Sequence, residues 1–549
     1  MSSGFRIVLR AAAAFFAFAG LTCQASASTP IWWGNSIGRA DVVLPGWSPV
    51  EVDGSTLVLG ADRRYEWKAS LLPARVSVGD DLLAGPFRLV ATINGERVDI
   101  AGDRLVITQE SPSSATVDTE GSLADDLSVV VSTRVEYDGL GSISITLTPG
   151  APVNLDGFDL EVDIVRSEYQ RMLAFDADTI HKRHKQVVFP AEYAGPFLNV
   201  LGFPDGERSF WLFADHAEGW IWNSNTVTEV AAHEDLLRIR QRLIGAAWTV
   251  SKPMHFEIHF LATPVRNASG EWRTHRAARL INEDEARIAH YQTWWMTAFA
   301  HQDLPYTDYP DGVRERLPKA DIDAYPGVVA NRAHLDDCRA VGITRLPYFS
   351  AHTLSGVDPV LEIYRDRWEV VPIKVMPDAS DAPFTAEIGK RWLSQRGEGY
   401  TDYLLHRFAA MIGELGFDGL YFDQGGVIGS RNPASGGWTD SNGVRQAGTD
   451  ILATRALFKR LAVLFHERGK PGLVVVHNSR VGVVPAYTFV TSMLQGEEYT
   501  VELAAGDYIR STDLDELRSV FAPGQYGVGV TWMSQLFSPR TNIPARRGR

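Results

Sequence analysis

The sequence has little cysteine and no excess of positive charge. Only two cysteines occur in 549 residues, and Cys23 lies in an amino-terminal segment expected to be removed. Cys338 then has no partner for an internal disulfide, so the core must supply the stability. The chain carries 67 acidic against 53 basic residues, a net charge of −14, which opposes binding to nucleic acid or an anionic lipid surface.

Several common functional motifs are also missing. No Gly-rich phosphate loop follows any strand-like run, so neither the dinucleotide nor the Walker fingerprint is present. The histidines His301, His352 and His477 lie on separate predicted strands and make no spaced metal motif,. We therefore expect no cofactor and no metal. No apolar run after the first 27 residues reaches 18 residues, so we expect no membrane span after processing.

Residues 1–27 are typical of a secretory signal. Two arginines precede an apolar run over 11–21 that is too short to span a bilayer, and Ala-Ser-Ala at 25–27 fits a cleavage site,. Removal would lower the net charge to −16 and place the protein in the periplasm or outside the cell. A lipoprotein signal is the alternative, but Thr22 directly before Cys23 matches a lipid-attachment site poorly.

Two patterns divide the remaining chain. In 28–270 apolar residues alternate with polar ones in short runs such as 127–137 and 142–147, broken by Gly, Pro, Asn and Asp. This period of two predicts antiparallel strands, and their number predicts a β-sandwich. Residues 271–292 are polar and helix-compatible, and we expect a connecting helix there.

From 293 to 549 strands and helices alternate. The helices expected at 403–415 and 450–468 are each followed by an apolar strand, which indicates a parallel sheet covered by helices. We expect strands at about 293–300, 344–350, 418–423, 473–477, 488–496 and 526–532, and a weak one between 369 and 392.

These seven strands favour a (β/α) TIM-like barrel over an open doubly wound sheet. The last of them ends within 20 residues of Arg549. We therefore expect the barrel to lack its last βα unit, through a truncated or frameshifted chain, or to close by other means.

Polar residues at the carboxyl ends of barrel strands form the active site in this fold. Asp423 is the best candidate, because in 419–423 side chains alternate and Tyr421 and Asp423 face the interior while Leu420 and Phe422 face the helices,. The next helix begins some 25 residues later, so Asp423 is not its N-cap. The competing interpretation is an Asp that only orders its loop.

Glu497 and Glu498 follow the sixth strand and supply a second carboxylate. Strand ends two positions apart lie roughly 10 Å from each other, so the pair fits glycosidic cleavage by either a retaining or an inverting route. The competing interpretation is that both glutamates are solvated loop acids. The remaining candidate substrate-binding residues are His301, Tyr348, His352, Tyr421, Gln424, Trp438, His477 and Asn478.

The Gly-, Ser- and Asn-rich stretch 425–449 joins the fourth strand to its helix. Loops of this length are usually functional or disordered. Its Trp438 suits stacking on a sugar face, with burial inside its own loop as the alternative.

The segments 256–264, 416–423, 477–479 and 496–499 resemble bacterial proteins related to glycoside hydrolase family 123. The resemblance implies an exported glycosidase with a β-sandwich and a barrel. The founding activity is that of a β-N-acetylgalactosaminidase that uses the 2-acetamido group of its substrate, oriented by an Asp and assisted by an adjacent Glu. Here Gln424 follows Asp423, and an amide cannot act as the acid.

The leading hypothesis is therefore an exported glycoside hydrolase acting on an oligosaccharide or polysaccharide, which includes N-acetylhexosaminides as candidate substrates. A second enzyme hypothesis is a retaining α-glycosidase of another barrel family, with Asp423 as nucleophile and Glu497 as acid/base. From a different class comes a catalytically silent glycan-binding protein, which Gln424 would suit.

Overall fold

The computed structural model describes residues 29–123, 126–166, 171–178, 188–190, 192–222, 225–267, 277–278, 291–294, 340, 344–355, 360–372, 375–376, 390–423, 425–478, 482–496, 514–521 and 526–532. The predicted signal peptide and everything after 532 lie outside these residues. So do both cysteines.

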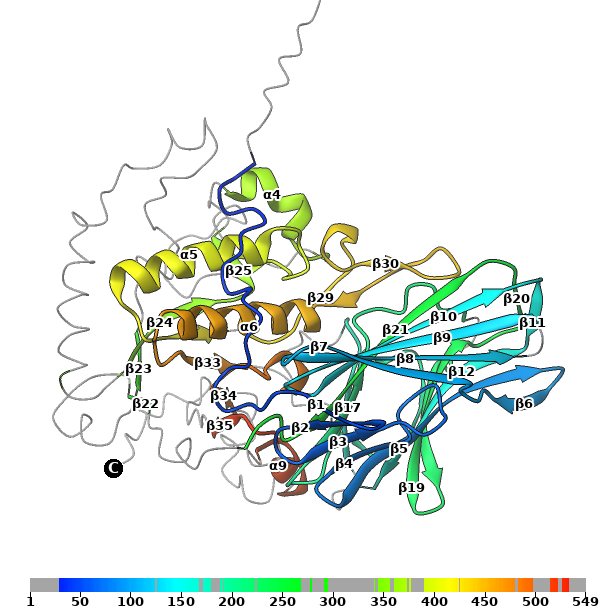
Figure 1. Cartoon of the computed structure of the whole chain (residues 1–549). Helices are drawn as coiled ribbons and strands as arrows, with labels where there is room; N and C mark the ends of the chain where they lie inside the picture. The colour runs from blue at the N-terminus through cyan, green and yellow to red at the C-terminus, as the bar shows by residue number, and fades with distance from the viewer. Residues whose placement is uncertain are drawn as a thin grey trace, which may run out of the picture.

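The first half of the chain is a sandwich of two antiparallel sheets, as predicted (Figure 1). One sheet has the order β1 (Glu51–Asp53), β2 (Thr56–Leu59), β3 (Arg63–Glu66), β4 (Arg75–Val78), β5 (Asp81–Ile93), β12 (Gly157–Val165), β19 (Leu236–Ile244), β18 (Thr228–His233) and β15 (Tyr193–Gly195), with β6 (Glu96–Asp99) paired to β5. The other has the order β14 (Val188–Pro190), β13 (Arg171–Phe175), β16 (Val200–Pro204), β17 (Ser209–Phe213), β21 (Met254–Thr263), β10 (Leu140–Pro149), β9 (Leu127–Glu136), β8 (Ser114–Leu123) and β7 (Arg104–Ser111). A separate two-stranded ribbon pairs β11 (Val153–Leu155) with β20 (Trp248–Val250).

The alternation of apolar and polar residues in the sequence matches the alternation of buried and exposed side chains in the strands. Along β9, Val129, Val131 and Val135 are fully buried, while Val130 between them is 38% exposed. Antiparallel sheets with one solvent-exposed face show this alternation because successive side chains point to opposite faces of the sheet.

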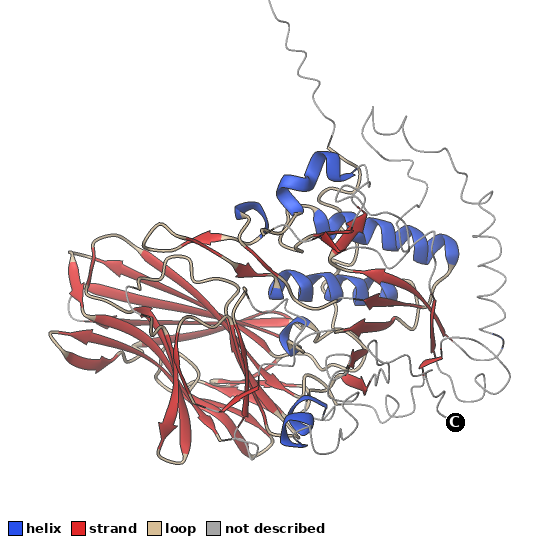
Figure 2. Cartoon of the chain, turned by 180° about the vertical axis from the view of Figure 1, so that it is seen from behind, coloured by secondary structure: helices blue, strands red, loops and turns tan. Residues whose placement is uncertain are grey.

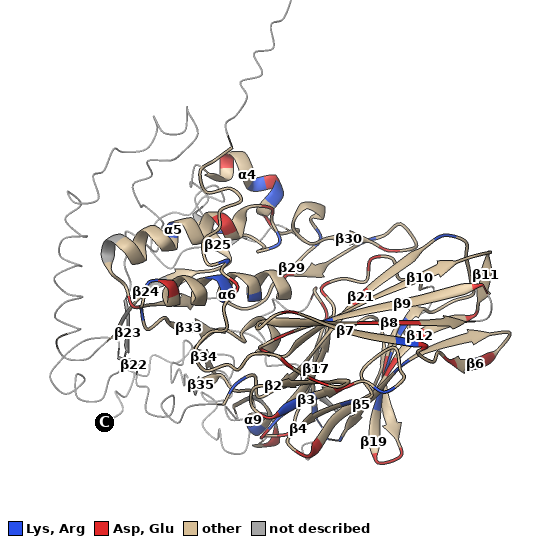
Figure 3. Cartoon of the chain, viewed as in Figure 1, with Lys and Arg blue, Asp and Glu red and all other residues tan. Residues whose placement is uncertain are grey.

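Strand β12 departs from that pattern because both of its faces are buried. Its outward-facing acids Asp159, Glu161 and Asp163 are covered by arginines of the neighbouring strands, which Figure 3 shows as adjacent blue and red segments on β12 and β19. Arg240 Nε donates to Glu161 Oε1 at 2.7 Å, and Arg238 Nε donates to Asp163 Oδ1 at the same distance. Burial opposes ionisation of all three acids, but the arginines hold the pKa values of Glu161 and Asp163 below their usual range, whereas burial raises that of Asp159,.

The second half contains a parallel sheet whose strands follow one another in chain order: β22 (Ala277–Ala278), β23 (Tyr291–Trp294), β24 (Thr344–Ser350), β28 (Gly419–Asp423), β33 (Leu473–His477), β34 (Ser492–Gln495) and β35 (Gly529–Trp532). Every neighbouring pair is parallel. This order is not that of a doubly wound sheet. Among the described residues no pairing joins β35 to β22.

Helices cover one side of this sheet (Figure 2). These are α5 (Tyr400–Leu415) and α6 (Ile451–Glu467). The remaining helices are α4 (Val360–Trp368) and α9 (Leu514–Phe521), with short 3-10 turns η4 (Pro433–Ser435) and η5 (Val484–Ala486). Helix α5 ends where the sequence predicted, at Gly416, whose φ of 73° is the left-handed conformation that glycine adopts at a helix end,. Within the described part of the chain, no helix has the length and apolarity needed to cross a bilayer.

Two predicted elements are wrong where the structure describes them. The weak strand between 369 and 392 is not part of the parallel sheet, because β27 (Lys390–Trp392) pairs antiparallel with β25 (Thr353–Ser355) and β26 (Val375–Met376) in a small separate sheet. The connecting helix over 271–292 is strand at Ala277–Ala278 and from Tyr291 onward, because these residues pair in parallel with each other. The rest of that segment lies outside the described residues.

The two halves share one hydrophobic core. Trp47 of the first half packs on Phe489 of the second, with ring centroids 5.4 Å apart, and Tyr137 of the sandwich contacts the same ring at 5.7 Å. The Trp32 ring packs nearly edge-on against Tyr364 and Trp368 of α4 and Tyr403 of α5. Residues 32–39 therefore belong by packing to the α/β half, whereas Val50, just before β1, bonds to the sandwich through Gln109.

Candidate functional site

The carboxyl ends of the central parallel strands bring polar residues together. Ser350 is the register partner of Asp423, and Phe422 is that of Val476, which places His477 beside Asp423. His477 is in turn paired with Leu494, directly before Gln495. Because parallel strands end at the same edge, these groups form a row across β24, β28, β33 and β34.

An apolar layer lies beneath this row. Leu346, Tyr421, Val475 and Leu494 form a small cluster of their own. The alternate residue Phe422 packs between Phe408 of α5 and Phe458 of α6, with ring centroids 5.4 and 5.5 Å away. The predicted alternation is confirmed: Tyr421 lies on one face of β28 and Phe422 on the helix-covered face. Asp423 continues the face of Tyr421.

Asp423 and His477 are joined by a hydrogen bond between Oδ1 and Nδ1, 2.8 Å long. The Asp423 side chain is 18% exposed and that of His477 is 7% exposed. The Asp423 carboxylate can therefore accept a hydrogen bond from His477 while part of it stays exposed to solvent. It can act as a nucleophile, as a general base or as a stabiliser of positive charge.

Asn478 follows His477 and is completely buried. Its backbone N–H donates to Leu494 O at 2.9 Å, but neither atom of its side-chain amide has a hydrogen-bond partner among the described residues. Unsatisfied buried amides are rare and costly. Its side chain is therefore a candidate for contact with a ligand, as the sequence predicted.

Two further residues of this row escaped the sequence analysis. The hydroxyl of Ser350 is buried without a partner among the described residues, and Gln495 is 1% exposed. Gly482 covers both Gln495 and Asn478 closely, since a Cβ there would lie 2.3 Å from Gln495 Nε2. No sequence motif marks Ser350 or Gln495. Only the register of the parallel strands shows that they lie in this row.

His352 is better explained by structure than by substrate binding. It is completely buried, with Nδ1 3.2 Å from Leu393 O and 3.5 Å from Asp450 Oδ2. Asp450 also accepts from the backbone N–H groups of Ile428 and Gln395. Burial raises the pKa of Asp450 to about 6. This pair fastens the start of α6 to the core.

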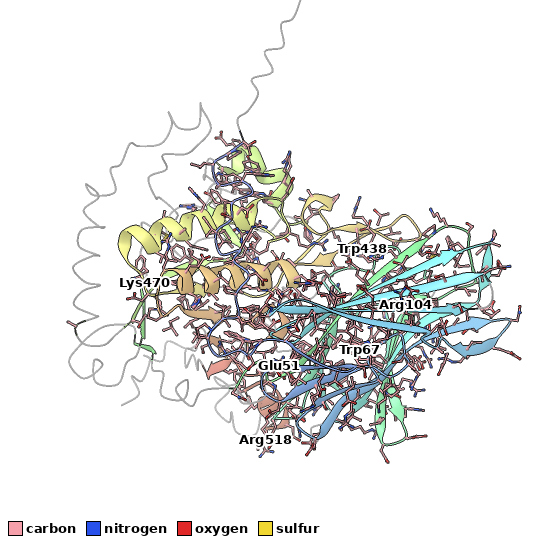
Figure 4. All side chains as sticks on the ribbon, viewed as in Figure 1. Glu51, Trp67, Arg104, Trp438, Lys470 and Arg518 are labelled. Carbon is pink, nitrogen blue, oxygen red and sulfur yellow. The ribbon has the colours of Figure 1, made fainter. Side chains whose placement is uncertain are left out.

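Trp438 lies on an arm that reaches over the sandwich (Figure 4). The arm is built from β29 (Gly429–Ser430) paired with β32 (Gly448–Thr449) and β30 (Trp438–Thr439) paired with β31 (Arg445–Gln446). The Trp438 ring is 3% exposed, contacts Trp222 at 5.4 Å and donates from Nε1 to Ala447 O. Little of the ring is left for a sugar.

The other predicted residues cannot be placed. Glu497, Glu498, His301 and Gln424 lie outside the described residues, and for Tyr348 only the backbone position opposite Tyr421 is described. Across the described ranges, no three His, Cys, Asp or Glu side chains converge as metal ligands do.

Residues 51–187 match the sequence model of glycoside hydrolase 123, third domain. The matched stretch begins with β1 and runs past β13 of the sandwich, about a quarter of the chain. It confirms the relation to glycoside hydrolase family 123, although the segments that first indicated the family lie elsewhere. The match also supports hydrolysis of glycosidic bonds as the class of reaction.

Solved structures with detectable similarity are distant. They include the GH36 alpha-galactosidase AgaA from Geobacillus stearothermophilus, 11% identical over 90% of this chain and 80% of that chain with a TM-score of 0.41. Another is the alpha-galactosidase from Lactobacillus brevis, 11% identical over 86% and 73% with a TM-score of 0.36. A GH31 family sulfoquinovosidase from E. rectale is 10% identical over 81% and 68%, with a TM-score of 0.33. Likenesses of this size carry no argument about substrate. A search of curated protein sequences finds no match.

Proposed function

We propose that the chain is an exported enzyme that hydrolyses glycosidic bonds in an oligosaccharide or polysaccharide, with Asp423 as one of its two carboxylates. The observation that carries the proposal is the position of Asp423, partly open to solvent and hydrogen-bonded to His477 at the carboxyl edge of the parallel sheet. The family relation of the sandwich supplies the reaction class. The consecutive strand order supports a (β/α) barrel as the scaffold,.

The two residues have different roles in this proposal. His477 donates from Nδ1 to Asp423 and fixes the direction of its carboxylate,. Asp423 then stabilises the positive charge that develops at the anomeric carbon or attacks it. Protonation of the leaving oxygen needs a second group, and Glu497 or Glu498 is our candidate for it. Gln424 cannot protonate the leaving oxygen because a side-chain amide does not act as a proton donor of this kind.

A hydrolysis screen tests the proposal. Aryl glycosides, including β-N-acetylgalactosaminides and α-galactosides, and a panel of polysaccharides are incubated with wild type and with Asp423→Asn. We expect sugar release by wild type and a loss of at least about a hundredfold in the variant. Equal release by both would remove Asp423 from the mechanism.

Asp418→Asn is the matched control. Asp418 directly precedes the opposite end of the same strand and pairs with Lys470 at 3.0 Å. The same chemical change there leaves the carboxyl edge untouched, so activity should stay at the wild-type level. If both variants lose activity together, the effect of Asp423→Asn is one of folding.

A glycan-binding protein without turnover is the second candidate. It is favoured by Gln424, which stands where the resembled enzymes carry an acid. Glycan binding that persists in Asp423→Asn, with no sugar release by wild type on any substrate, would support it over the enzyme.

A further inference from the structure

A groove of about 510 Å³ lies on the sandwich, outside the polar row. One wall is the connection between β17 and β18 around 216–221, and the other is the turn from β20 into β21 around 248–257. The ribbon of β11 and β20 stands at the end of the sandwich away from the parallel sheet (Figure 1). The groove is therefore separate from Asp423 and His477.

Trp248 stands on the edge of this groove. Trp248 is 42% exposed, more than any other aromatic residue whose burial the structure describes. Its position is fixed, because Trp248 pairs with Leu155 across the ribbon and Val250, two residues on, is completely buried. An aromatic ring held at the edge of a groove, with part of its surface open to solvent, is available to stack on a flat ligand.

The groove is apolar within and polar at its rim. Trp220 is buried beneath it, and Ile221 and Met254 are half-buried against it. At the rim, the side chains of Glu218 and Lys252 are exposed, and neither makes a hydrogen bond or ion pair with the described residues. Glu257 of the same lining is also exposed and lies 3.5 Å from His255 Nε2. The rim thus offers carboxylate acceptors from Glu218 and Glu257 and an ammonium donor from Lys252.

This arrangement matches the chemistry of a neutral sugar ring. One face of a pyranose carries C–H groups of slight positive charge, which are attracted to the negative face of an indole ring. Its hydroxyls need both donors and acceptors at the periphery. An aliphatic ligand would leave these rim groups unused.

We propose that this groove is a second carbohydrate site, in which Trp248 stacks on a pyranose unit of a neutral glycan chain and Glu218 and Lys252 bond its hydroxyls. The site holds a polymer near the enzyme without taking part in bond cleavage. It goes beyond the proposed function and does not require that Asp423 be catalytic.

Binding is measured with the Asp423→Asn protein, so that no polymer is consumed. Affinity electrophoresis is run in gels that contain soluble neutral glucan, galactan, xylan or mannan. We expect retardation by at least one polymer, and Trp248→Ala should weaken that association about tenfold or more. Trp248→Phe keeps a flat ring and should retain an intermediate affinity.

Val130→Ala is the matched control, because Val130 is an exposed apolar side chain on a different strand of the same sandwich. It should bind as the parent does. Retardation that is equal in the parent and Trp248→Ala would overturn the proposal, as would no retardation in any polymer. A concentration-dependent dimer that Trp248→Ala disrupts, without glycan binding, would also overturn it and assign the groove to a second copy of the chain.

The outcomes separate this proposal from the catalytic one. Loss of binding in Trp248→Ala, with wild-type hydrolysis of small aryl glycosides kept, supports both. Trp248-dependent binding without hydrolysis by the wild type supports the groove alone. Hydrolysis without Trp248-dependent binding supports the catalytic site alone.

Discussion

His477 Nδ1 and Asp423 Oδ1 lie 2.8 Å apart at the ends of adjacent parallel strands. If the histidine orients the carboxylate, His477→Leu should lower kcat about a hundredfold, because one donor to a charged group at the reacting centre is lost. His477→Asn should retain much more activity, since the Asn amide nitrogen can occupy the place of Nδ1. KM should change little in either. Steady-state kinetics on an aryl glycoside give the answer, and equal losses in the two variants would contradict an orienting role.

Arg455 of α6 reaches across to the sandwich and is almost fully buried. It donates to Asp138 Oδ1 at 2.7 Å and to Glu136 Oε2 at 3.0 Å. Burial opposes ionisation of Glu136, but Arg455 and Lys459 hold its pKa well below the usual value. Arg455→Ala leaves two buried carboxylates without their main partner, and we expect a loss of about 3–5 kcal/mol in the free energy of unfolding.

Denaturant unfolding measures that loss, and Arg104→Ala is its control. Arg104 pairs with Glu120 at 2.9 Å in the same sandwich, but the two side chains are 64% and 50% exposed. An exposed pair contributes at most about 1 kcal/mol. Similar losses in both variants would show that burial of the Arg455 cluster is not what stabilises the contact.

Trp32 anchors the amino-terminal segment on the helices of the second half. It is 4% exposed and surrounded by Tyr364, Trp368 and Tyr403. Trp32→Ala should lower the free energy of unfolding by about 3–5 kcal/mol, because the cavity cannot close among rigid rings. Its neighbour Ile31 is 65% exposed, so Ile31→Ala should stay within about 0.5 kcal/mol of wild type. Thermal unfolding of the two variants side by side tests the contrast.

The sequence predicted those parts of the fold that local periodicity determines. The strand at 344–350 has the predicted bounds, and the helix stop at Gly416 is correct, because both depend on residues close together in the chain. The placement of Tyr421 and Phe422 on opposite faces of β28 followed from alternation alone. Asp423 and His477 were both proposed from their place after apolar runs, but their hydrogen bond depends on strand order, which no local pattern contains.

Long-range contacts explain what the sequence could not predict. Asp215 of the sandwich accepts from the backbone N–H of Ile451 at 2.9 Å and of Leu452 at 3.3 Å, and so caps α6 from another part of the chain. The side chain of Asp450, the adjacent residue, makes no such cap. In the same way, the sequence left Trp438 between stacking on a sugar and burial within its own loop, whereas its ring packs on Trp222 of the sandwich. Neither partner can be found without the tertiary structure.

Asp450 should make stability depend on pH. Burial raises its pKa from 3.8 to about 6, so the folded state binds a proton that the unfolded state releases in this range. The stabilisation is complete below about pH 4 and is lost as the pH rises through 6. By linkage the loss is on the order of 3 kcal/mol. Burial lowers the pKa of His259 to about 4, which raises stability over much of the same range, so the wild-type curve alone cannot show the effect.

The difference in unfolding free energy between wild type and Asp450→Asn isolates the contribution of Asp450, because His259 is present in both proteins. Asn carries no titrating proton at this position, so the free energy of unfolding of the variant relative to wild type should increase between pH 4 and 7 by roughly the amount that ionisation of Asp450 costs. Glu207→Gln, at a side chain that is 86% exposed, should run parallel to wild type throughout. Urea unfolding at half-unit pH steps measures all three, and a pH-independent difference for Asp450→Asn would show that this carboxylate is already ionised in the folded protein at pH 4, with its charge satisfied by the N–H groups of Ile428 and Gln395.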